Sequence, residues 1–373
     1  MSNGSGNHVY AVIMAGGFGK KLWPVSRKKM PKQFVDLFDD GTMIAQTVRR
    51  ISGLVREENI LIITSELGRT LISESLRNFR NDNIIVEPSS RNTAPCIALA
   101  TAHIKKRDPD AVTVVLPADH LVLNNEAFLK IIEAGIDVAS ETKGIVTIGI
   151  KPDRPEIAYG YIQVNGEQPL PPTFSDARDF RLFRVKAFAE KPDLTTALEF
   201  LESHDFYWNS GVFIWHIDAI AKEFERSMPD LYKDLLNIYE SLGTEREQKV
   251  IKDVYTWIHP LSIDYGIMEK AEKVFVLTGE FGWTDLGCWD EVVKVVETRS
   301  ASVGVQPDNL LVKIDCENVF VKNTTDKVVC TIGIKDLLIV QAENALLICR
   351  KGESHRVREV VDILRREGLA EYL

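Results

Sequence analysis

The chain has 373 residues, of which 45% are hydrophobic and 27% charged, and its formal net charge is −9. A chain of this length and ordinary composition is expected to fold into two globular domains. The acidic balance argues against a nucleic acid as partner, and no run approaches the roughly 20 apolar residues that a membrane span needs.

The first residues and the cysteines indicate the cellular compartment. Residues 1–8 are polar and glycine-rich and contain no apolar secretory core, which predicts a disordered leader and a cytoplasmic protein. The five cysteines are odd in number, and none has the spacing of zinc ligands, so we expect all five thiols to be reduced. They are Cys96, Cys288, Cys316, Cys330 and Cys349.

Apolar strands and amphipathic helices alternate over the first 150 residues. This alternation predicts an α/β fold with a Rossmann-like, mainly parallel sheet, whose ligands gather at the carboxyl ends of the strands. Strands are expected at Tyr10–Met14, Asn59–Thr64, Asn83–Glu87, Val112–Pro117 and Gly144–Ile150. Helices are expected near residues 43–56, 67–79, 94–106 and 126–140.

A cationic, glycine-rich loop follows the first of these strands. The segment Gly16–Phe34 contains three glycines (Gly16, Gly17 and Gly19) and six cations, but no acid. Glycine lets the backbone approach a ligand and aim N–H groups at it, while lysine and arginine supply positive charge. In an acidic protein such a loop indicates a bound polyanion, most simply a phosphate chain. Its spelling excludes a Walker A loop and a GxGxxG dinucleotide fingerprint.

Two aspartates are candidate magnesium ligands. Asp119 follows the apolar run VTVVL, at the sheet edge where the glycine loop is also expected, although a helix cap or turn is its alternative role. Asp285 lies in a segment rich in glycine and aromatic residues, where an acid is either buried and paired or used. Mg²⁺ prefers oxygen ligands and often takes one or two carboxylates. The acids of the rival segment 108–110 are interpreted as a turn.

The pattern changes twice farther along the chain. Longer strands start near residue 155, and helices follow near 218–240 and 244–254. Past residue 300, short β-rich pieces separated by turns predict a small β-domain, closed by a helix at 353–367. The predicted domains are residues 9–300 and 301–373, with a boundary near Arg299–Pro307.

Seven segments of the first 290 residues resemble, in the same order, those of one family. A GGxGxRL-x-P loop followed by a PK pair is typical of the sugar-nucleotide pyrophosphorylases. The continuation WPxS…PKQF and the segment RNTAP resemble the mannose-1-phosphate guanylyltransferase branch. The resemblance implies a nucleotidyltransferase catalytic domain and a C-terminal left-handed β-helix. The loop residues that fit are Gly16, Gly17, Gly19, Leu22, Trp23, Pro24, Pro31 and Lys32.

The resemblance also implies roles for residues in binding the two substrates. The segment EPxxRNTAP implies that Glu87 and Asn92 contact the nucleotide base, although Asn92 is also a possible helix cap. The segments YGYI, EKP and WNSG imply contacts with the sugar phosphate. The residues assigned to it are Gly160, Glu190, Lys191 and Asn209.

The catalytic groups are assigned on the same basis. Lys21 and the backbone of the loop would hold the triphosphate, Lys32 would neutralise the α-phosphate, and Asp119 and Asp285 together would hold Mg²⁺. Lys21 replaces the family arginine, which keeps the charge but loses the planar bidentate fork. The family's Thr-Gly before YGYI is also replaced, by Ile157 and Ala158.

The expected reaction joins GTP and α-D-mannose 1-phosphate to give GDP-mannose and pyrophosphate, with Mg²⁺ as cofactor. The resemblance further implies a homodimer. Two alternatives stay open at this point. The substrate can be another sugar 1-phosphate or another nucleotide, or the chain can be a non-catalytic regulatory protein that binds a GDP-sugar.

Overall fold

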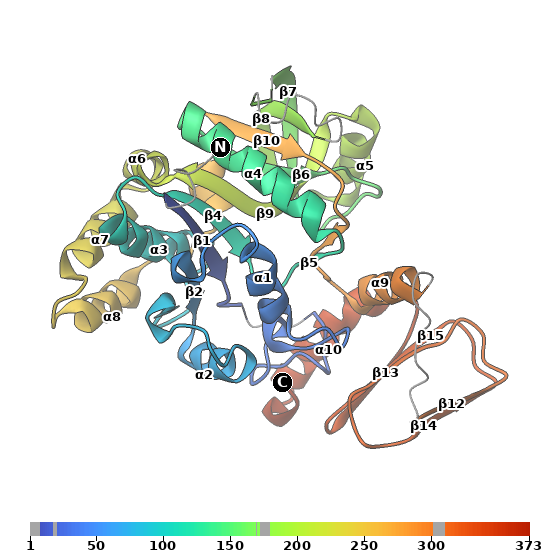
Figure 1. Ribbon diagram of the computed structural model, residues 1–373. Helices are drawn as coiled ribbons and strands as arrows, with labels where there is room; N and C mark the ends of the chain where they lie inside the picture. Colours follow the sequence, from blue (N-terminus) through green and yellow to red (C-terminus); the bar gives the residue numbers. More distant parts are fainter. Residues whose placement is uncertain (1–7, 18–20, 169, 172–179, 301–309) are drawn as a thin grey trace. The chain divides into compact units, whose positions relative to one another are not determined.

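The computed structural model of the chain describes residues 8–17, 21–168, 170–171, 180–300 and 310–373 (Figure 1). The predicted leader, apart from His8, lies outside the described residues, as does most of the predicted domain boundary. The chain divides into two compact units, each assembled from several segments. The first unit contains Met1–Gly16, Thr47–Ala118 and Val122–Trp283, and the second unit contains Gly17–Gln46, Asp119–Leu121 and Thr284–Leu373.

A nine-stranded mixed sheet forms the first unit, in the order β3-β2-β1-β4-β9-β6-β10-β8-β7. Strands β3, β2, β1 and β4 are parallel neighbours, as the strand–helix alternation predicts, and all five residues of β2 are buried. Strand β9 runs antiparallel to β4 and β6, so the sheet is mixed. The strands are β1 (Val9–Met14), β2 (Ile60–Thr64), β3 (Ile84–Val86), β4 (Val112–Pro117), β6 (Ile145–Ile150), β7 (Gly160–Gln168), β8 (Arg181–Glu190), β9 (Phe206–His216) and β10 (Val274–Thr278).

Helices cover both faces of this sheet. Helix α4 (Asn125–Thr142) lies over β9, β4 and β6 (Figure 1) and approaches Ile214 of β9 so closely that a Cβ added at Gly135 would lie 2.4 Å from it. The neighbouring side chains Phe213 and Trp215 pack instead with helices α3 and α6. Because successive residues of a strand point to opposite faces, α4 and the pair α3 and α6 lie on opposite sides of β9.

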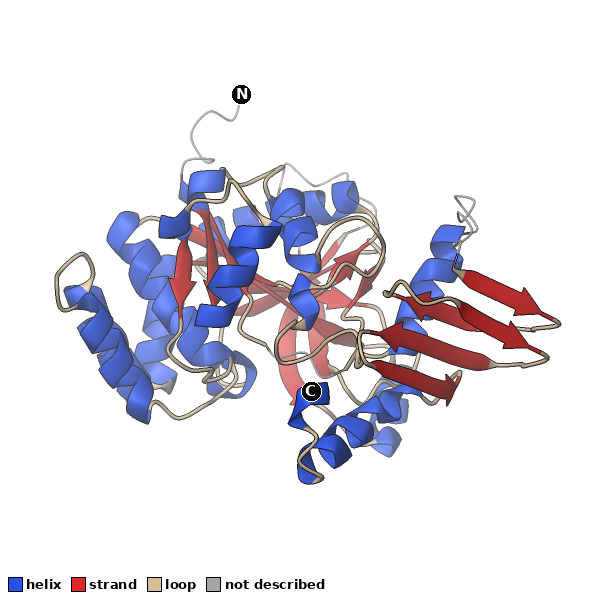
Figure 2. Cartoon of the chain, turned by 90° about the horizontal axis from the view of Figure 1, so that it is seen from below, coloured by secondary structure: helices blue, strands red, loops and turns tan. Residues whose placement is uncertain are grey.

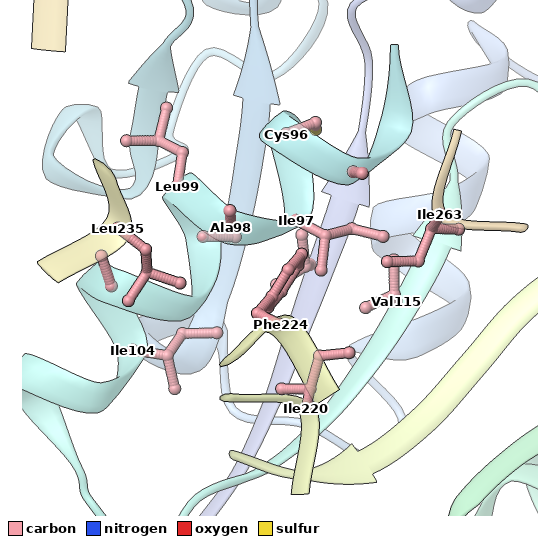
Figure 3. Packing of buried hydrophobic residues seen from close by; sticks show 14 of the residues in the cluster. Cys96, Ile97, Ala98, Leu99, Ile104, Val115, Ile220, Phe224, Leu235 and Ile263 are labelled. Atoms are coloured by element: carbon pink, nitrogen blue, oxygen red, sulfur yellow. The ribbon is translucent and has the colours of Figure 1, made fainter. Parts of the chain in front are cut away.

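Helices α3 (Thr93–Arg107), α6 (Ile217–Ser227), α7 (Pro229–Ser241) and α8 (Glu247–Trp257) supply the main core of the first unit. Figure 3 shows Ile97 and Ile104 of α3 close to Phe224 and Ile220 of α6. The prediction of one helix at 218–240 is wrong, because Pro229 starts a new helix and disfavours helical backbone at Met228, where φ is −141°.

The remaining helices of the described residues are shorter or lie nearer the ends of the chain. The predicted helices at 43–56 and 67–79 are confirmed, although both end earlier than predicted. These helices are α1 (Met43–Ile51), α2 (Glu66–Ser75), α5 (Leu194–Ser203), α9 (Trp289–Ser300) and α10 (Val357–Arg366). A two-stranded sheet pairs β5 (Leu121–Val122) with β11 (Trp283–Thr284). No helix in the described ranges is both long and apolar enough to cross a membrane.

Four C-terminal strands of the second unit pair in parallel, as successive turns of a coil (Figure 2). Leu311 pairs with Val329 and Phe320 with Leu338, so equivalent positions lie 18 residues apart. At the corners, Asn318 and Asp336 have positive φ angles and are joined by a 2.6 Å hydrogen bond. This stacking confirms the predicted β-helix-like domain. The coil strands are β12 (Leu311–Ile314), β13 (Phe320–Asn323), β14 (Val329–Ile332) and β15 (Leu337–Ala342). The last strand, β16 (Ala345–Arg350), runs antiparallel to β15.

The core of the second unit joins the segment after the glycine loop to the C-terminal strands. Leu22 and Trp23 pack in one cluster with the fully buried Trp289 of α9 and with Leu338 of β15 and Leu347 of β16. The indole of Trp289 donates a 2.9 Å hydrogen bond to the backbone oxygen of Trp23. The cationic segment is therefore held by residues that are more than 250 positions away in the sequence.

Candidate active site

The glycine loop begins where β1 ends, at the carboxyl edge of the parallel strands. Gly16 has little room for a larger residue, because an added Cβ would lie 3.1 Å from the carboxylate of Glu87. Gly17 is exposed, and its backbone oxygen accepts a 2.8 Å hydrogen bond from Nε2 of Gln33. Gly19, the third predicted loop glycine, lies outside the described residues.

The four predicted catalytic side chains meet in the second unit. Nζ of Lys21 lies 2.8 Å from Oδ2 of Asp285, and Nζ of Lys32 lies 3.0 Å from Oδ2 of Asp119. Lys32 also donates a hydrogen bond to the backbone oxygen of Asp285. The Lys32 side chain is only 2% exposed, so its charge needs these acceptors. Lys32 thus joins the two aspartates into one network.

The backbone around Asp285 fixes the direction of its carboxylate. The residue follows β11, and the N–H of Leu286 donates to Oγ1 of Thr284 at 3.1 Å. Leu286 has a φ of +46°, which turns the chain sharply. A Cβ added at Gly287 would lie 2.9 Å from Oδ1 of Asp285, so the glycine leaves room for the acid. The predicted WTDLG segment therefore presents one carboxylate from a tight turn.

The lysines keep both aspartates ionised. Burial alone would raise the pKa of Asp285, but Lys21 and Lys32 outweigh burial and hold this pKa well below its usual value. Burial likewise opposes ionisation of Asp119, and Lys32 lowers its pKa below the ordinary value. Burial lowers the pKa of His120 to about 4, so this imidazole, 3.9 Å from Asp119, is neutral at pH 7.

This donor set suits a hard divalent cation. Asp119 and Asp285 offer ionised carboxylate oxygens, and the Asp119 side chain is 36% exposed. Among the described residues there is no group of three or more His, Cys, Asp or Glu side chains that could hold a metal. Mg²⁺ does not require such a group, because it usually keeps several waters and binds through one or two carboxylates and substrate phosphates.

Glu87, predicted to contact the base, is buried in the first unit. The residue is 6% exposed, and its Oε1 accepts a 3.0 Å hydrogen bond from the hydroxyl of Tyr255. Burial raises the pKa of Glu87 to about 7, although hydrogen bonds from Tyr255 and Cys96 act in the other direction. The side chain is thus directed into the protein around Tyr255, and its contact with a base stays a prediction.

Asn92, the second predicted base contact, is exposed at the start of α3. Its Oδ1 accepts a 2.8 Å hydrogen bond from the N–H of Thr93, and its φ is +70°. With a ψ of −169°, this backbone conformation is one that essentially only glycine adopts without strain. The cap uses the amide oxygen and leaves the amide nitrogen to other partners. A helix cap and a ligand contact are therefore compatible at this position.

Three strands of the first unit bring the predicted sugar-phosphate residues together. Gly160 begins β7 and is paired with Glu190 at the end of β8, and β7 also pairs with β9, which carries Asn209. A Cβ added at Gly160 would lie 2.5 Å from the Glu190 carboxylate and 3.6 Å from Cβ of Asn209. Lys191 forms an ion pair with Glu190, and its side chain is 61% exposed. The four residues form one cluster.

Asp264 completes this cluster, and we did not predict it from the sequence. Nδ2 of Asn209 donates a 2.8 Å hydrogen bond to Oδ1 of Asp264. Burial, together with the nearby charge of Glu190, raises the pKa of Asp264 to about 6. One sequence signal could have indicated Asp264: it is an acid in the largely apolar run LSIDYGIM. Acids in such surroundings are usually paired or take part in binding or catalysis.

Comparisons with known proteins decide the family. A family model described as "Nucleotidyl transferase" matches residues 10–301, and one described as "MannoseP isomerase/GMP-like beta-helix domain" matches residues 309–364. "Mannose-1-phosphate guanylyltransferase 2" of Escherichia coli O157:H7 is 35% identical over 370 residues, which cover 98% of this chain and 75% of that relative. The chain belongs to the mannose-1-phosphate guanylyltransferase family. It is an enzyme of the nucleotidyltransferase class, as the resemblance implied.

Further comparisons with this guanylyltransferase family agree over nearly the whole chain. "Alginate biosynthesis protein AlgA" of Pseudomonas aeruginosa is 33% identical over 368 residues, covering 96% of this chain and 73% of that relative. A crystal structure described as "mannose-1-phosphate geranyltransferase", from Thermus thermophilus, has a TM-score of 0.80 and 30% sequence identity, and the match covers 96% of this chain and 99% of that chain. These likenesses confirm the predicted fold class.

The burial of Glu87 predicts a pH-dependent contribution to stability. Its folded pKa of about 7 lies above its ordinary value of 4.5, so the folded state retains a proton that the unfolded state loses. This contribution is complete below about pH 4.5 and is lost as the pH rises through 7, with a total of about 3 kcal/mol. We expect Glu87→Gln, which keeps the acceptor for Tyr255, to lack this loss. Urea unfolding of both proteins between pH 4.5 and 8 measures it, and parallel pH profiles would contradict the prediction.

Proposed function

We propose that this enzyme transfers GMP from GTP to α-D-mannose 1-phosphate, giving GDP-mannose and pyrophosphate. The observation that carries the proposal is the network of Lys21, Lys32, Asp119 and Asp285, in which two ammonium groups contact two aspartates. The reaction joins two polyanions, so its main electrostatic problem is their mutual repulsion. A site with two cations and two metal-binding carboxylates answers that need.

The sugar phosphate serves as its own nucleophile. The second pKa of a phosphate monoester is about 6, so the group is largely ionised at neutral pH and needs no general base. Catalysis then consists of alignment for in-line displacement at the α-phosphorus and of charge neutralisation. In this proposal Lys21 and the backbone around Gly16 and Gly17 hold the triphosphate. Lys32 neutralises the α-phosphate, and Lys191 neutralises the sugar phosphate.

Asp119 and Asp285 would hold Mg²⁺, which supplies charge neutralisation to both reactants when bound. The ammonium groups of Lys21 and Lys32 contact the two carboxylates that would hold the metal. We propose that the lysines exchange carboxylate partners for phosphate oxygens once both substrates are present, so that no charge is left unpaired.

The choice of guanine and mannose rests on the relatives. The curated relatives are named mannose-1-phosphate guanylyltransferases, and the candidate binding residues Glu87, Asn92, Glu190 and Asn209 lie in segments that resemble theirs. A second candidate function is a regulatory protein that binds a GDP-sugar without turnover. Its support is Lys21, which replaces the family arginine and is engaged with Asp285. The presence of both aspartates favours the enzyme.

We further propose that the protein works in the cytoplasm as a homodimer. Support for the dimer comes from apolar side chains that are exposed on the coil, at Val312 and Ile314 of β12 and Ile332 of β14.

Light scattering coupled to gel filtration should give twice the 42.0 kDa chain mass. Ile332→Lys should shift the mass toward the monomer, whereas a wild-type mass of one chain at micromolar concentration would exclude the dimer.

The metal assignment predicts a large loss of turnover in Asp119→Asn. Removing one preorganised charge contact should lower kcat about 10²–10³-fold, while the amide keeps an acceptor for Lys32 and the fold survives. The matched control is Asp110→Asn, in the exposed turn before β4, which should retain wild-type turnover. Pyrophosphate release at saturating Mg²⁺ measures turnover, and circular dichroism checks folding. Full activity of a folded Asp119→Asn enzyme would refute the assignment.

Substrate identity is tested by a panel of nucleoside triphosphates against several sugar 1-phosphates. We expect the highest kcat/KM with GTP and mannose 1-phosphate. A higher kcat/KM with another base or sugar would support the same type of reaction but would show that the proposed nucleotide or sugar 1-phosphate is wrong. Tight GDP-mannose binding without pyrophosphate release for any pair would favour the regulatory function instead.

A further inference from the structure

The side-chain amide of Asn209 is held by the protein at both its oxygen and its nitrogen. A side-chain amide has two N–H donors and two acceptor positions on its oxygen. Oδ1 of Asn209 accepts from the N–H of Gly211 at 3.1 Å. The hydroxyl of Thr147 lies 3.4 Å from the same oxygen, but its single proton has a shorter acceptor in the backbone oxygen of Val212, at 2.9 Å. Nδ2 donates to Oδ1 of Asp264 at 2.8 Å. Among the described residues, one hydrogen bond thus holds the oxygen and one holds the nitrogen, which leaves one N–H for a substrate.

These partners also fix which way the amide points. The backbone N–H of Gly211 can only donate, so the oxygen of Asn209 must face it. The acceptor on the other side is the carboxylate of Asp264, so the nitrogen must face Asp264. A register shift between β6 and β9 lies at this point, between Thr147 and Gly149, and such bulges redirect side chains. Without Asp264, only the oxygen side of the amide would be held.

Asp264 is itself held by the segment that carries Asn92. The N–H of Ile263 donates to Oγ1 of Thr93 at 2.8 Å, and the N–H of Ala94 donates to the backbone oxygen of Leu261 at 3.0 Å. The Ile263 side chain is 1% exposed and lies in the core near Val115 (Figure 3). The backbone before Asp264 is thus fixed by the start of α3 and by the core.

Asn209 and Asp264 lie beside the other predicted sugar-phosphate residues. An added Cβ at Gly160 would lie 2.5 Å from the Glu190 carboxylate, so a larger residue would displace this carboxylate. Asp264 and Glu190 are near enough for the charge of Glu190 to raise the pKa of Asp264. The remaining N–H of Asn209 therefore belongs to a cluster in which the other polar groups are two carboxylates and the ammonium of Lys191.

We infer that Asp264 is a positioning residue for the sugar-phosphate substrate and acts through Asn209. Its carboxylate holds the amide so that one N–H is presented to the sugar 1-phosphate, and it links that amide to the start of α3. The inference rests on the proposed function, because it takes the cluster of Gly160, Glu190, Lys191 and Asn209 as the sugar-phosphate site. It adds a residue that belongs to none of the predicted motifs.

The test compares steady-state constants of Asp264 variants. Asp264→Leu removes the acceptor at similar volume, so KM for the sugar 1-phosphate should rise about tenfold, the effect of losing one oriented hydrogen bond. KM for GTP should change less than twofold. Asp264→Asn keeps an acceptor oxygen and should restore KM to within about threefold of wild type. A general loss of stability would not distinguish the two substrates in this way.

A double variant tests whether Asp264 acts through Asn209. If it does, the double variant should have a KM for the sugar 1-phosphate no more than twofold above that of Asn209→Ala, because the amide that Asp264 positions is already absent. Should Asp264→Leu fail to fold, Asp264→Ser takes its place, since a serine hydroxyl is too short to reach the amide. Independent, multiplicative effects of the two substitutions would overturn the inference, as would an unchanged sugar-phosphate KM.

The matched control is Asp205→Leu. Oδ2 of Asp205 accepts a 2.8 Å hydrogen bond from Nε2 of Gln163 on β7, so this pair repeats the aspartate–amide contact outside the cluster. Its removal should leave both KM values unchanged. The assays use whichever sugar 1-phosphate the wild-type enzyme accepts. An inactive or differently specific wild type therefore counts against the proposed function, and a normal KM in the variants counts against the inference about Asp264.

Discussion

A buried ammonium group between two aspartates is the interaction on which the proposed chemistry depends. Lys32 is 2% exposed and contacts the carboxylate of Asp119 and the backbone of Asp285. A charge in this position is tolerated only because acceptors surround it. Lys21 and Lys32 lower the pKa of Asp285, and Lys32 lowers that of Asp119, so both carboxylates are ionised at neutral pH. One network therefore explains both the local stability of the site and its proposed reactivity.

The surrounding fold determines where each charged group can be presented. In the second unit, the buried cluster of Leu22, Trp23 and Trp289 holds the cationic segment against the C-terminal strands. In the first unit, the ends of β7 and β8 bring Gly160 and Glu190 together. Apolar packing supplies most of the stability in each unit, and the polar residues lie where strands end and the backbone can turn.

The sequence allowed prediction of the elements and motifs whose signal is local. Five early strands and the stacked C-terminal strands follow from apolar runs and turn spacing, and the order of the motifs identified the family. Contacts between distant residues have no such signal. Lys32 and Asp285 are 253 residues apart, and Asp264 reaches Asn209 across 55 residues. The sequence around Asp264 does not indicate that Asn209 is its partner. The end of helix α6 at Met228 was not predicted because the apolar periodicity continues through it.

The most direct test of the central claim is a crystal structure with mannose 1-phosphate, a non-hydrolysable GTP analogue and Mg²⁺. The account predicts a metal ion within about 2.1 Å of oxygens from both Asp119 and Asp285. It also predicts that the ammonium groups of Lys21 and Lys32 have moved from those carboxylates to phosphate oxygens. A metal ion bound to neither aspartate, or lysines still paired with the carboxylates beside bound substrates, would contradict it.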